Sequence, residues 1–189
     1  IKAQLDETVR QTNQMLSLAR TDSAQLALQD TDLVALAREA TRSSWASARE
    51  SGIDLGFDAP DGALVLAVQP SLLREALANL LHNALRYTPH GGQVTVRVWR
   101  SAEASHLGVV DDGPGIPEDE LAHAGERFFR GSNTSQPGTG LGLAIVQAIA
   151  VRHGASLQLG TCLLYNSEAA GDTHCEDLGG WRDRYTQEP

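Results

Sequence analysis

The chain has 189 residues, of which 41% are hydrophobic, and a formal net charge of -9 at pH 7. This length and composition suffice for one globular domain with a core and a few further elements. The negative charge argues against nucleic acid or an anionic membrane as the main partner, because both bind basic surfaces. No apolar run approaches the roughly 20 residues of a membrane helix, and the first residues lack a signal-peptide layout. We therefore expect a cytoplasmic protein.

Residues 1–22 have the pattern of an amphipathic or coiled-coil helix, with apolar or small side chains at steps of three and four. These side chains are Ile1, Leu5, Val9, Thr12, Leu16 and Ala19. Such a seam needs a partner. The partner is a helix from missing sequence, a second copy, which gives a homodimer, or the chain's own domain. Because the chain begins inside this helix with Ile1 rather than Met, we expect a piece of a longer protein. Any membrane segment would then lie in the missing upstream sequence.

A composition change near residues 21–30 predicts a domain boundary, and a helix then begins at a cap formed by Thr31 or Asp32. Two short apolar runs follow, GIDLGFD and ALVLAV, bounded by Gly, Pro and Asp. Runs of this kind predict strands, and their closeness in sequence favours a hairpin between them.

The second half of the chain alternates again between helix and strand patterns. Residues 71–85 predict a helix with a broad apolar face, and residues 93–99 and 105–112 predict neighbouring strands. Residues 113–139 contain no clear element, and a loop of that length in a compact domain is usually functional or mobile. A last helix over 140–154 closes at a glycine.

Three polar side chains interrupt the apolar face of the 71–85 helix at every fourth position: Glu75, Asn79 and Asn83. A buried Asn amide costs stability unless it is paired, so these amides are either satisfied structural groups or face a cavity. In the second case their oxygens suit a hard cation such as Mg²⁺, which also binds waters and phosphate oxygens.

Two glycine-rich stretches come later: DDGPGIP ends a predicted strand, and PGTGLGLAIV opens a predicted helix. A carboxylate beside bare backbone suits ligand contact, and glycines at a helix start let backbone N–H groups approach an anion. Each stretch also fits a plain alternative, a solvated turn in the first case and a tight helix–sheet contact in the second. Neither stretch decides the function alone.

In order, the segments NLLHNALRYTPHGG, DDGPGIP, ERFFRG and PGTGLGLAIV resemble the N, G1, F and G2 boxes of bacterial sensor histidine kinases. These boxes form the catalytic ATP-binding domain of that family, within the GHKL ATPase superfamily. The resemblance covers roughly residues 1–160, with all four boxes in family order and spacing. It implies an α/β two-layer sandwich, a mixed sheet packed on helices (the GHKL or Bergerat ATP-binding fold), preceded by a dimerisation helix.

The resemblance also divides the chain into three parts. Residues 1–22 would be the second helix of a truncated dimerisation and phosphoacceptor domain, and residues 23–160 the catalytic ATP-binding domain. Residues 161–189 depart from the family pattern, because no sustained alternation follows Tyr165 where a final strand usually lies. We expect them to form an atypical, disordered tail.

Carried over position by position, the resemblance makes Asn83 the principal Mg²⁺ ligand, with Asn79 helping to orient metal or water. Asp111 would accept a hydrogen bond from the adenine amino group and so discriminate against guanine, which presents a carbonyl oxygen there. The residues implied to contact ATP are Asn79, Asn83, Arg86, Tyr87, Asp111, Gly113, Gly115, Ile116, Phe128, Phe129, Arg130, Gly138, Thr139, Gly140, Leu141 and Gly142.

The implied reaction is transfer of the ATP γ-phosphoryl group to a histidine, for relay to a response regulator receiver domain. The acceptor histidine is missing, since none of the 6 histidines has the family's acceptor context, and we assign no catalytic residue. We expect His82 on a helix surface. A non-catalytic nucleotide-sensing or dimerisation module remains an alternative, and so does another GHKL ATPase. The latter typically carries Glu as its base where this chain has Asn79.

Overall fold

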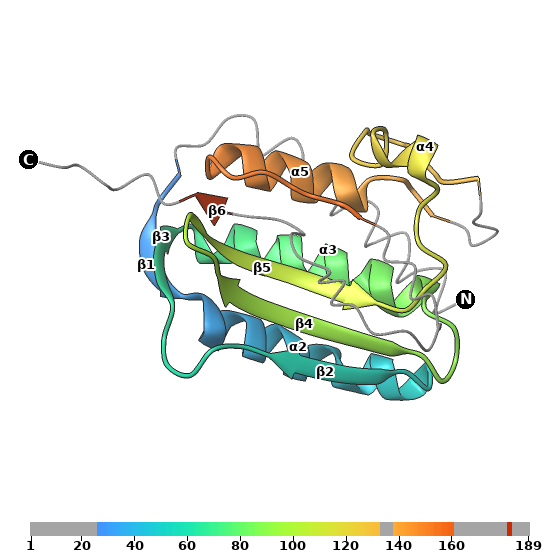
Figure 1. The fold of residues 1–189 in the computed structure, drawn as a ribbon, viewed down its shortest axis with the longest axis horizontal. Helices are drawn as coiled ribbons and strands as arrows, with labels where there is room; N and C mark the ends of the chain where they lie inside the picture. Colours follow the sequence, from blue (N-terminus) through green and yellow to red (C-terminus); the bar gives the residue numbers. More distant parts are fainter. Residues whose placement is uncertain (1–25, 133–137, 161–180, 183–189) are drawn as a thin grey trace, which may run out of the picture.

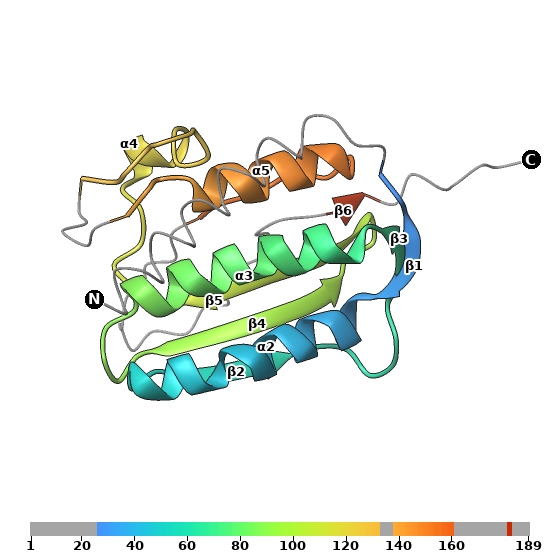
Figure 2. The same cartoon turned by 180° about the vertical axis from the view of Figure 1, so that it is seen from behind.

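The structure is a computed structural model that describes residues 26–132, 138–160 and 181–182. It has the predicted sandwich: a mixed sheet lies on one side, and helices α2 (Leu33–Glu50) and α3 (Pro70–Tyr87) cover one face of it (Figures 1 and 2). The helix predicted over residues 1–22 lies outside the described residues. No described helix is long and apolar enough to cross a membrane.

The helices begin and end close to the predicted positions. Of the two predicted caps of α2, Thr31 and Asp32, the structure has Asp32, whose carboxylate accepts a hydrogen bond from the Val34 N–H at 3.0 Å. Helix α5 (Gly142–Arg152) is followed by Gly154 with a φ of 69°, the left-handed conformation that glycine adopts without strain. The described residues of the stretch predicted without an element contain a single helical turn, α4 (Glu118–Leu121).

The sheet has the order β2-β4-β5-β6, in which β2 and β4 are parallel and the other neighbours antiparallel. The first three strands are β2 (Asp54–Asp58), β4 (Gln93–Arg100) and β5 (Ala104–Asp111). The prediction that β4 and β5 are neighbours is confirmed, with Val96 opposite Val109.

The predicted hairpin between GIDLGFD and ALVLAV is wrong. Strand β3 (Val65–Val68) pairs instead with β1 (Gln29–Asp32) in a separate two-stranded sheet. Asp32 helps to explain this pairing, because its carboxylate also accepts a hydrogen bond from the Leu64 N–H at 3.1 Å and so holds β3 beside the start of α2. Strand β1 escaped prediction because its sequence, QDTD, is polar and lacks apolar alternation.

Two residues of the predicted C-terminal tail form a short strand. Strand β6 (Trp181–Arg182) pairs with the start of β5, where Ser105 lies opposite Trp181 and Ala104 opposite Arg182. This pairing departs from the expectation of a disordered tail. The remainder of that predicted segment lies outside the described residues.

The core lies between the sheet and the two covering helices. Strand β4 shows why: Val94, Val96 and Val98 alternate inward and are at most 2% exposed, whereas the residues between them are partly exposed. A second cluster joins α3 to α5. Its buried members are Ala76, Leu141, Ile145, Val146 and Ile149. Each large side chain buried in these clusters contributes about 1.5–3 kcal/mol, so α5 is fixed against α3 with its first residues beside the Asn-bearing face.

Candidate nucleotide site

A cavity of about 300 Å³ lies between α3, β5, the loop after β5 and the start of α5. The sequence predicted contributions from these four segments, and the fold brings them together. The predicted residues that line the cavity are Asn83, Arg86, Tyr87, Asp111, Gly113, Gly115, Ile116, Phe129, Arg130, Gly138, Thr139, Gly140 and Gly142.

Three predicted residues do not line the cavity. Asn79 is 8% exposed, and its Nδ2 donates to the Glu75 carbonyl at 2.9 Å. Leu141 is 1% exposed and belongs to the apolar cluster between α3 and α5. Phe128 is 64% exposed and has a φ of 68°, which is unusual for a residue other than glycine. Leu141 and Phe128 thus occupy structural positions next to the cavity.

The two asparagines lie one helical turn apart on α3, and both face the first residue of α5. A Cβ placed on Gly142 would lie 3.4 Å from both terminal atoms of the Asn83 amide and 3.6 Å from Asn79 Oδ1. The backbone is therefore bare where the amides approach the helix start. The described residues contain no cluster of three or more His, Cys, Asp or Glu side chains suited to a metal. Two neutral amides fit Mg²⁺ only when phosphate oxygens and waters complete its coordination.

Asp111 and Asp112 are adjacent in sequence but have different roles. The Asp112 carboxylate accepts a hydrogen bond from the Gln93 N–H at 2.9 Å and so ties the end of β5 to the start of β4. Asp111 lines the cavity, and its Oδ1 accepts from the Gly113 N–H at 3.0 Å. A Cβ on Gly113 would lie 2.7 Å from that oxygen, so a larger residue there would displace the Asp111 carboxylate.

The electrostatics of Asp111 follow from this position. Burial of the carboxylate raises its pKa above the ordinary value, the neighbouring charge of Asp112 raises it further, and the hydrogen bond from Gly113 partly opposes both. Although the residue as a whole is exposed, its carboxylate is partly shielded from water at the cavity wall. A shielded acceptor at a strand end is suited to recognise a hydrogen-bond donor on a flat ligand.

The F-box and G2-box segments are joined directly by backbone contacts. The Phe128 N–H donates to the Gly140 carbonyl at 2.9 Å. Gly140 has a φ of 65°, and a Cβ there would lie 2.5 Å from the Phe129 carbonyl oxygen. The Glu120 carboxylate accepts from the Ser132 N–H at 3.0 and 3.1 Å, which anchors the start of the connecting segment. Residues 133–137 lie outside the described part.

Arg86 and Tyr87 lie at the C-terminal end of α3, and both line the cavity. The guanidinium carbon of Arg86 is 6.0 Å from the centre of the Tyr87 ring. A Cβ on Gly138 would be 3.7 Å from Arg86 Nη1 and 3.8 Å from Tyr87 Oη. The Arg86 guanidinium and the Tyr87 ring therefore border Gly138, in the segment before α5.

The sequence reasoning missed part of the cavity wall. His82 is partly buried and lines the cavity, so its expected place on a helix surface is wrong. It neighbours Asn83 on the helix and follows Asn79 by three positions, which turns it partly toward the same side. Leu107 and Val109 also line the cavity. They precede Asp111 by four and two positions on β5, so strand alternation alone places them on the same face of the strand as Asp111.

Comparisons with known proteins agree with this geometry. Residues 68–176 match the family model described as histidine kinase-, DNA gyrase B-, and HSP90-like ATPase. The sensor protein QseC of Salmonella typhi is 36% identical over 163 residues, which cover 85% of this chain and 35% of that protein. This chain thus spans about a third of the length of that relative.

Solved structures give the same result. The mycobacterial sensor histidine kinase MprB is 31% identical with a TM-score of 0.60, over 68% of this chain and 83% of that chain. Full-length ShkA in complex with AMPPNP is 25% identical with a TM-score of 0.73, over 93% of this chain and 34% of that chain. The predicted family and fold class are confirmed: the chain belongs to the histidine kinase-, DNA gyrase B- and HSP90-like ATPases, as an ATPase catalytic domain of the sensor histidine kinase type.

Proposed function

We propose that the cavity binds ATP with Mg²⁺, and that the chain is the catalytic part of a sensor histidine kinase. The observation that carries this proposal is the convergence of the Asn83 amide, a strand-end carboxylate and a bare helix start on one cavity. Such a kinase transfers the γ-phosphoryl group to a histidine, which then supplies a response regulator receiver domain. Homologous sensor proteins such as QseC support this assignment.

Asp111 is proposed to bind the adenine amino group. Its carboxylate lies on the cavity wall, where the apolar side chains of Leu107 and Val109 continue along the same face of β5. A flat base fits against such a wall, and a carboxylate at its end accepts hydrogen bonds only from donors. Since a raised pKa brings protonation closer to neutral pH, we expect nucleotide affinity to fall on acidification.

The start of α5 is proposed to hold the phosphates. Its first turn contains no acidic residue, and no side-chain hydrogen bond caps it. Its first N–H groups and its partial positive charge therefore suit an anion. Arg86 and Arg130 add positive charge to the cavity lining.

Asn83, assisted by Asn79, would hold Mg²⁺ through amide oxygens. When bound, the ion neutralises phosphate charge and polarises the transferred group. The chain's own residues orient the nucleotide and exclude water from its base. Positioning and charge neutralisation account for most of the catalysis in phosphoryl transfer, so no covalent intermediate on this chain is required.

The acceptor histidine is proposed to come from another dimerisation helix, because no histidine of this chain stands in the acceptor context. Residues 1–22 would contribute to a homodimer, and the kinase would be the cytoplasmic part of a membrane-bound sensor whose membrane connection lies upstream. A second candidate is a non-catalytic module that senses nucleotide or dimerises. An ATPase that hydrolyses ATP with an activated water is less favoured. Such enzymes typically use a Glu as the general base, and this chain has Asn79 at that position.

The first experiment is calorimetric titration with a non-hydrolysable ATP analogue, with and without Mg²⁺. We expect Mg²⁺-dependent binding that is weakened at least roughly tenfold by Asp111→Asn and by Asn83→Ala. Asp112→Asn is the matched control: it makes the same charge change next door but retains an acceptor for the Gln93 N–H, and binding should persist.

The second step adds a separate helix that carries an acceptor histidine. Formation of phosphohistidine on this helix supports the kinase. Good binding of ATP without any phosphohistidine favours the non-catalytic module. Failure of the well-folded parent chain to bind the analogue would refute the proposed nucleotide site itself.

A further inference from the structure

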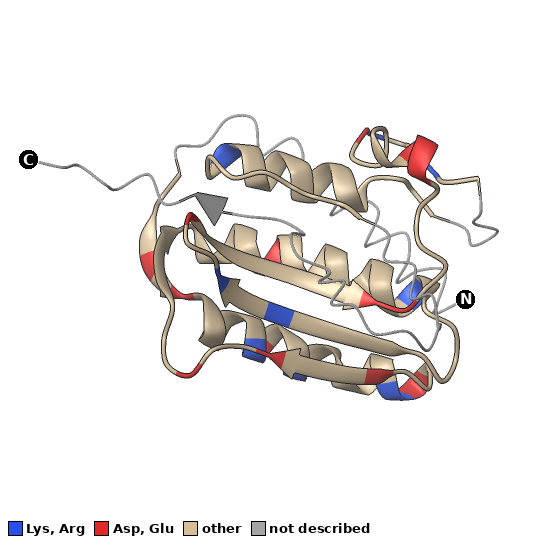
Figure 3. Ribbon diagram, in the orientation of Figure 1, with Lys and Arg blue, Asp and Glu red and all other residues tan. Residues whose placement is uncertain are grey.

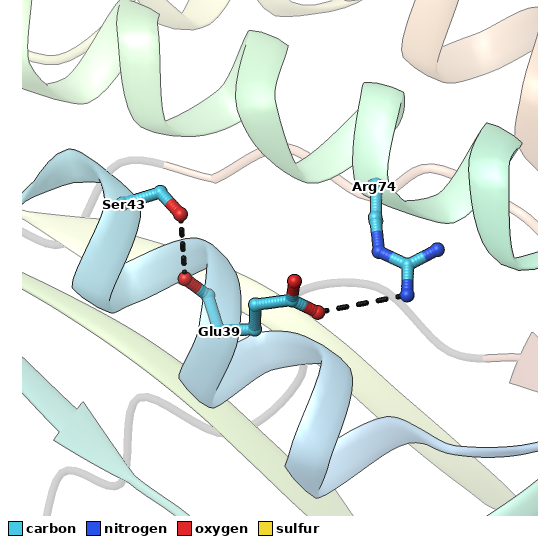
Figure 4. Close-up of polar contacts among 3 residues, drawn as sticks. All are labelled: Glu39, Ser43 and Arg74. Carbon is cyan, nitrogen blue, oxygen red and sulfur yellow. Dashed lines mark hydrogen bonds and ion pairs between the residues drawn. The ribbon is translucent and has the colours of Figure 1, made fainter.

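Helix α2 has two chemically different exposed sides. The side toward α3 is acidic and internally paired: the Glu39 carboxylate lies 3.5 Å from Arg74 Nη2, and the Glu39 carbonyl accepts from the Ser43 hydroxyl at 2.9 Å (Figure 4). Glu50 follows on this side at the end of the helix. Glu39 on this side therefore interacts within the domain.

The exposed side of α2 toward β2 carries a row that we call the basic stripe: Arg38, Arg42, Trp45 and Arg49. Its members follow one another at steps of four, three and four, so they lie along one helix face for about 16 Å. All are exposed, and Trp45 is 68% exposed. Basic residues recur along α2 in Figure 3, although the whole chain has a net charge of -9.

The basic stripe borders the outermost strand on that side of the sheet. The guanidinium carbon of Arg38 lies 5.4 Å from the centre of the Phe57 ring on β2, which fixes this side of α2 next to β2. Strand β2 ends the strand order, and its second edge pairs with no described strand. Within the described part of the chain, Arg42 and Arg49 form no ion pair or side-chain hydrogen bond.

Folding alone provides no reason for this arrangement. Like charges at helical spacing, as in Arg38 and Arg42, destabilise an isolated helix by a few tenths of a kcal/mol. A single exposed apolar side chain is ordinary on a protein surface. Three arginines around an exposed tryptophan are different, because Arg and Trp are the residue types that dominate protein interfaces when they become buried.

We propose that the basic stripe docks an acidic segment of a partner protein. Carboxylates on the partner pair with the guanidinium groups, which bind them through two parallel hydrogen bonds, and an apolar side chain covers Trp45. A helix with acidic residues spaced like the arginines matches the length of the stripe.

The borders of the stripe favour a protein over a broad anionic surface. Acidic residues flank it on both sides: Glu39 and Glu50 on α2, and Asp54 and Asp58 on β2. A membrane or nucleic acid would bring negative charge against these carboxylates as well, whereas a narrow row of partner carboxylates avoids them. The stripe is also separate from the nucleotide site, because no described residue of α2 lines that cavity.

The test uses the whole chain and a fluorescein-labelled helical peptide of about 16 residues, with Glu opposite the three arginines and Leu opposite Trp45. Fluorescence anisotropy should show saturable binding that weakens with salt. Arg42→Glu and Trp45→Ala should each weaken it roughly tenfold. Arg74→Glu makes the same charge change as Arg42→Glu on the other side of α2 and should change affinity less than about twofold.

Other results would overturn the proposal. A peptide with Lys in place of Glu should not bind, and equal losses in the Arg42→Glu and Arg74→Glu variants would indicate nonspecific attraction. Binding to phosphatidylserine vesicles or single-stranded DNA that exceeds peptide binding and disappears in Arg42→Glu would replace the protein partner. Self-association lost in Arg42→Glu would assign the stripe to a second copy. Binding of the ATP analogue confirms folding of each variant, and its failure in the parent chain bears only on the nucleotide site.

Discussion

The starts of helices α2 and α5 are built in opposite ways. At α2, the Asp32 carboxylate accepts from both the Val34 and Leu64 N–H groups, so the protein itself satisfies the helix start. At α5, the N-cap residue is Leu141, with no side-chain hydrogen bond and no acidic residue in the first turn. Its first residues, Gly142 and Leu143, line the cavity instead. The first helix start therefore contributes to stability, and the second is the one that we propose holds the phosphates.

The largest expected effect on stability comes from removing the cap of α2. Asp32→Ala deletes the acceptor for two backbone N–H groups, one in the helix and one before β3, and should lower the free energy of unfolding by about 1–3 kcal/mol. Urea denaturation measures this loss. Asp32→Asn retains an oxygen acceptor and should retain most of the stability. A full loss in Asp32→Asn would show that the carboxylate charge, rather than the hydrogen bonds, stabilises this end.

At the start of α5, one substitution is expected to lower nucleotide affinity without lowering stability. Gly142→Ala raises helix propensity by about 0.5–1 kcal/mol. Its Cβ would stand 3.4 Å from the Asn83 amide, so affinity for the ATP analogue should fall several-fold while thermal stability holds or rises. Scanning calorimetry and titration on the same samples separate the two effects. Unchanged affinity with raised stability would mean that this helix start is not part of the ligand site.

The smallest expected effect concerns α3, whose start is held by a distant side chain. The Gln69 N–H donates to His153 Nε2 at 3.0 Å, and His153 Nδ1 lies 2.8 Å from the Ile149 carbonyl. This pattern requires a neutral imidazole with its proton on Nδ1. Burial lowers the pKa of His153 most, Arg152 lowers it further, and the Ile149 carbonyl partly opposes both.

The sign of the pH effect follows from this lowered pKa. Above the unfolded-state pKa of 6.5, His153 is neutral in both the folded and the unfolded state, and its full contribution to the free energy of unfolding is present. As the pH falls from 6.5 toward the folded pKa, the unfolded state binds a proton first, so stability decreases. Urea midpoints at pH 7.5 and 5.5 measure the change, and His153→Gln, which keeps an acceptor without titrating, should reduce the pH dependence. The exposed His123 has a raised pKa from its hydrogen bond to Glu126 and acts in the opposite direction. A larger midpoint at pH 5.5 would contradict the assignment to His153.

Much of the fold followed from local sequence patterns. The periodicity of four and three predicted α3 and α5, and alternation predicted β4 and β5, because each pattern reports the face of a single element. The glycine-rich boxes predicted part of the cavity lining for a similar reason: glycine is required where the backbone is left-handed and closely packed, as at Gly140 beside the Phe129 carbonyl. These requirements are local and remain legible in the sequence.

Only the tertiary structure shows which strands pair and which side chains from distant elements come into contact. Strand β3 pairs with β1 rather than with β2. The Asp32 carboxylate, 32 residues before Leu64, accepts a hydrogen bond from the Leu64 N–H and supports this pairing. Likewise, the contact of Gly142 with Asn83 depends on the packing of α5 against α3. The sequence by itself determined most of the elements, the family and somewhat under half of the residues that line the cavity. Which elements meet, and which polar groups they satisfy or leave to a ligand, depends on distant contacts that no local pattern records.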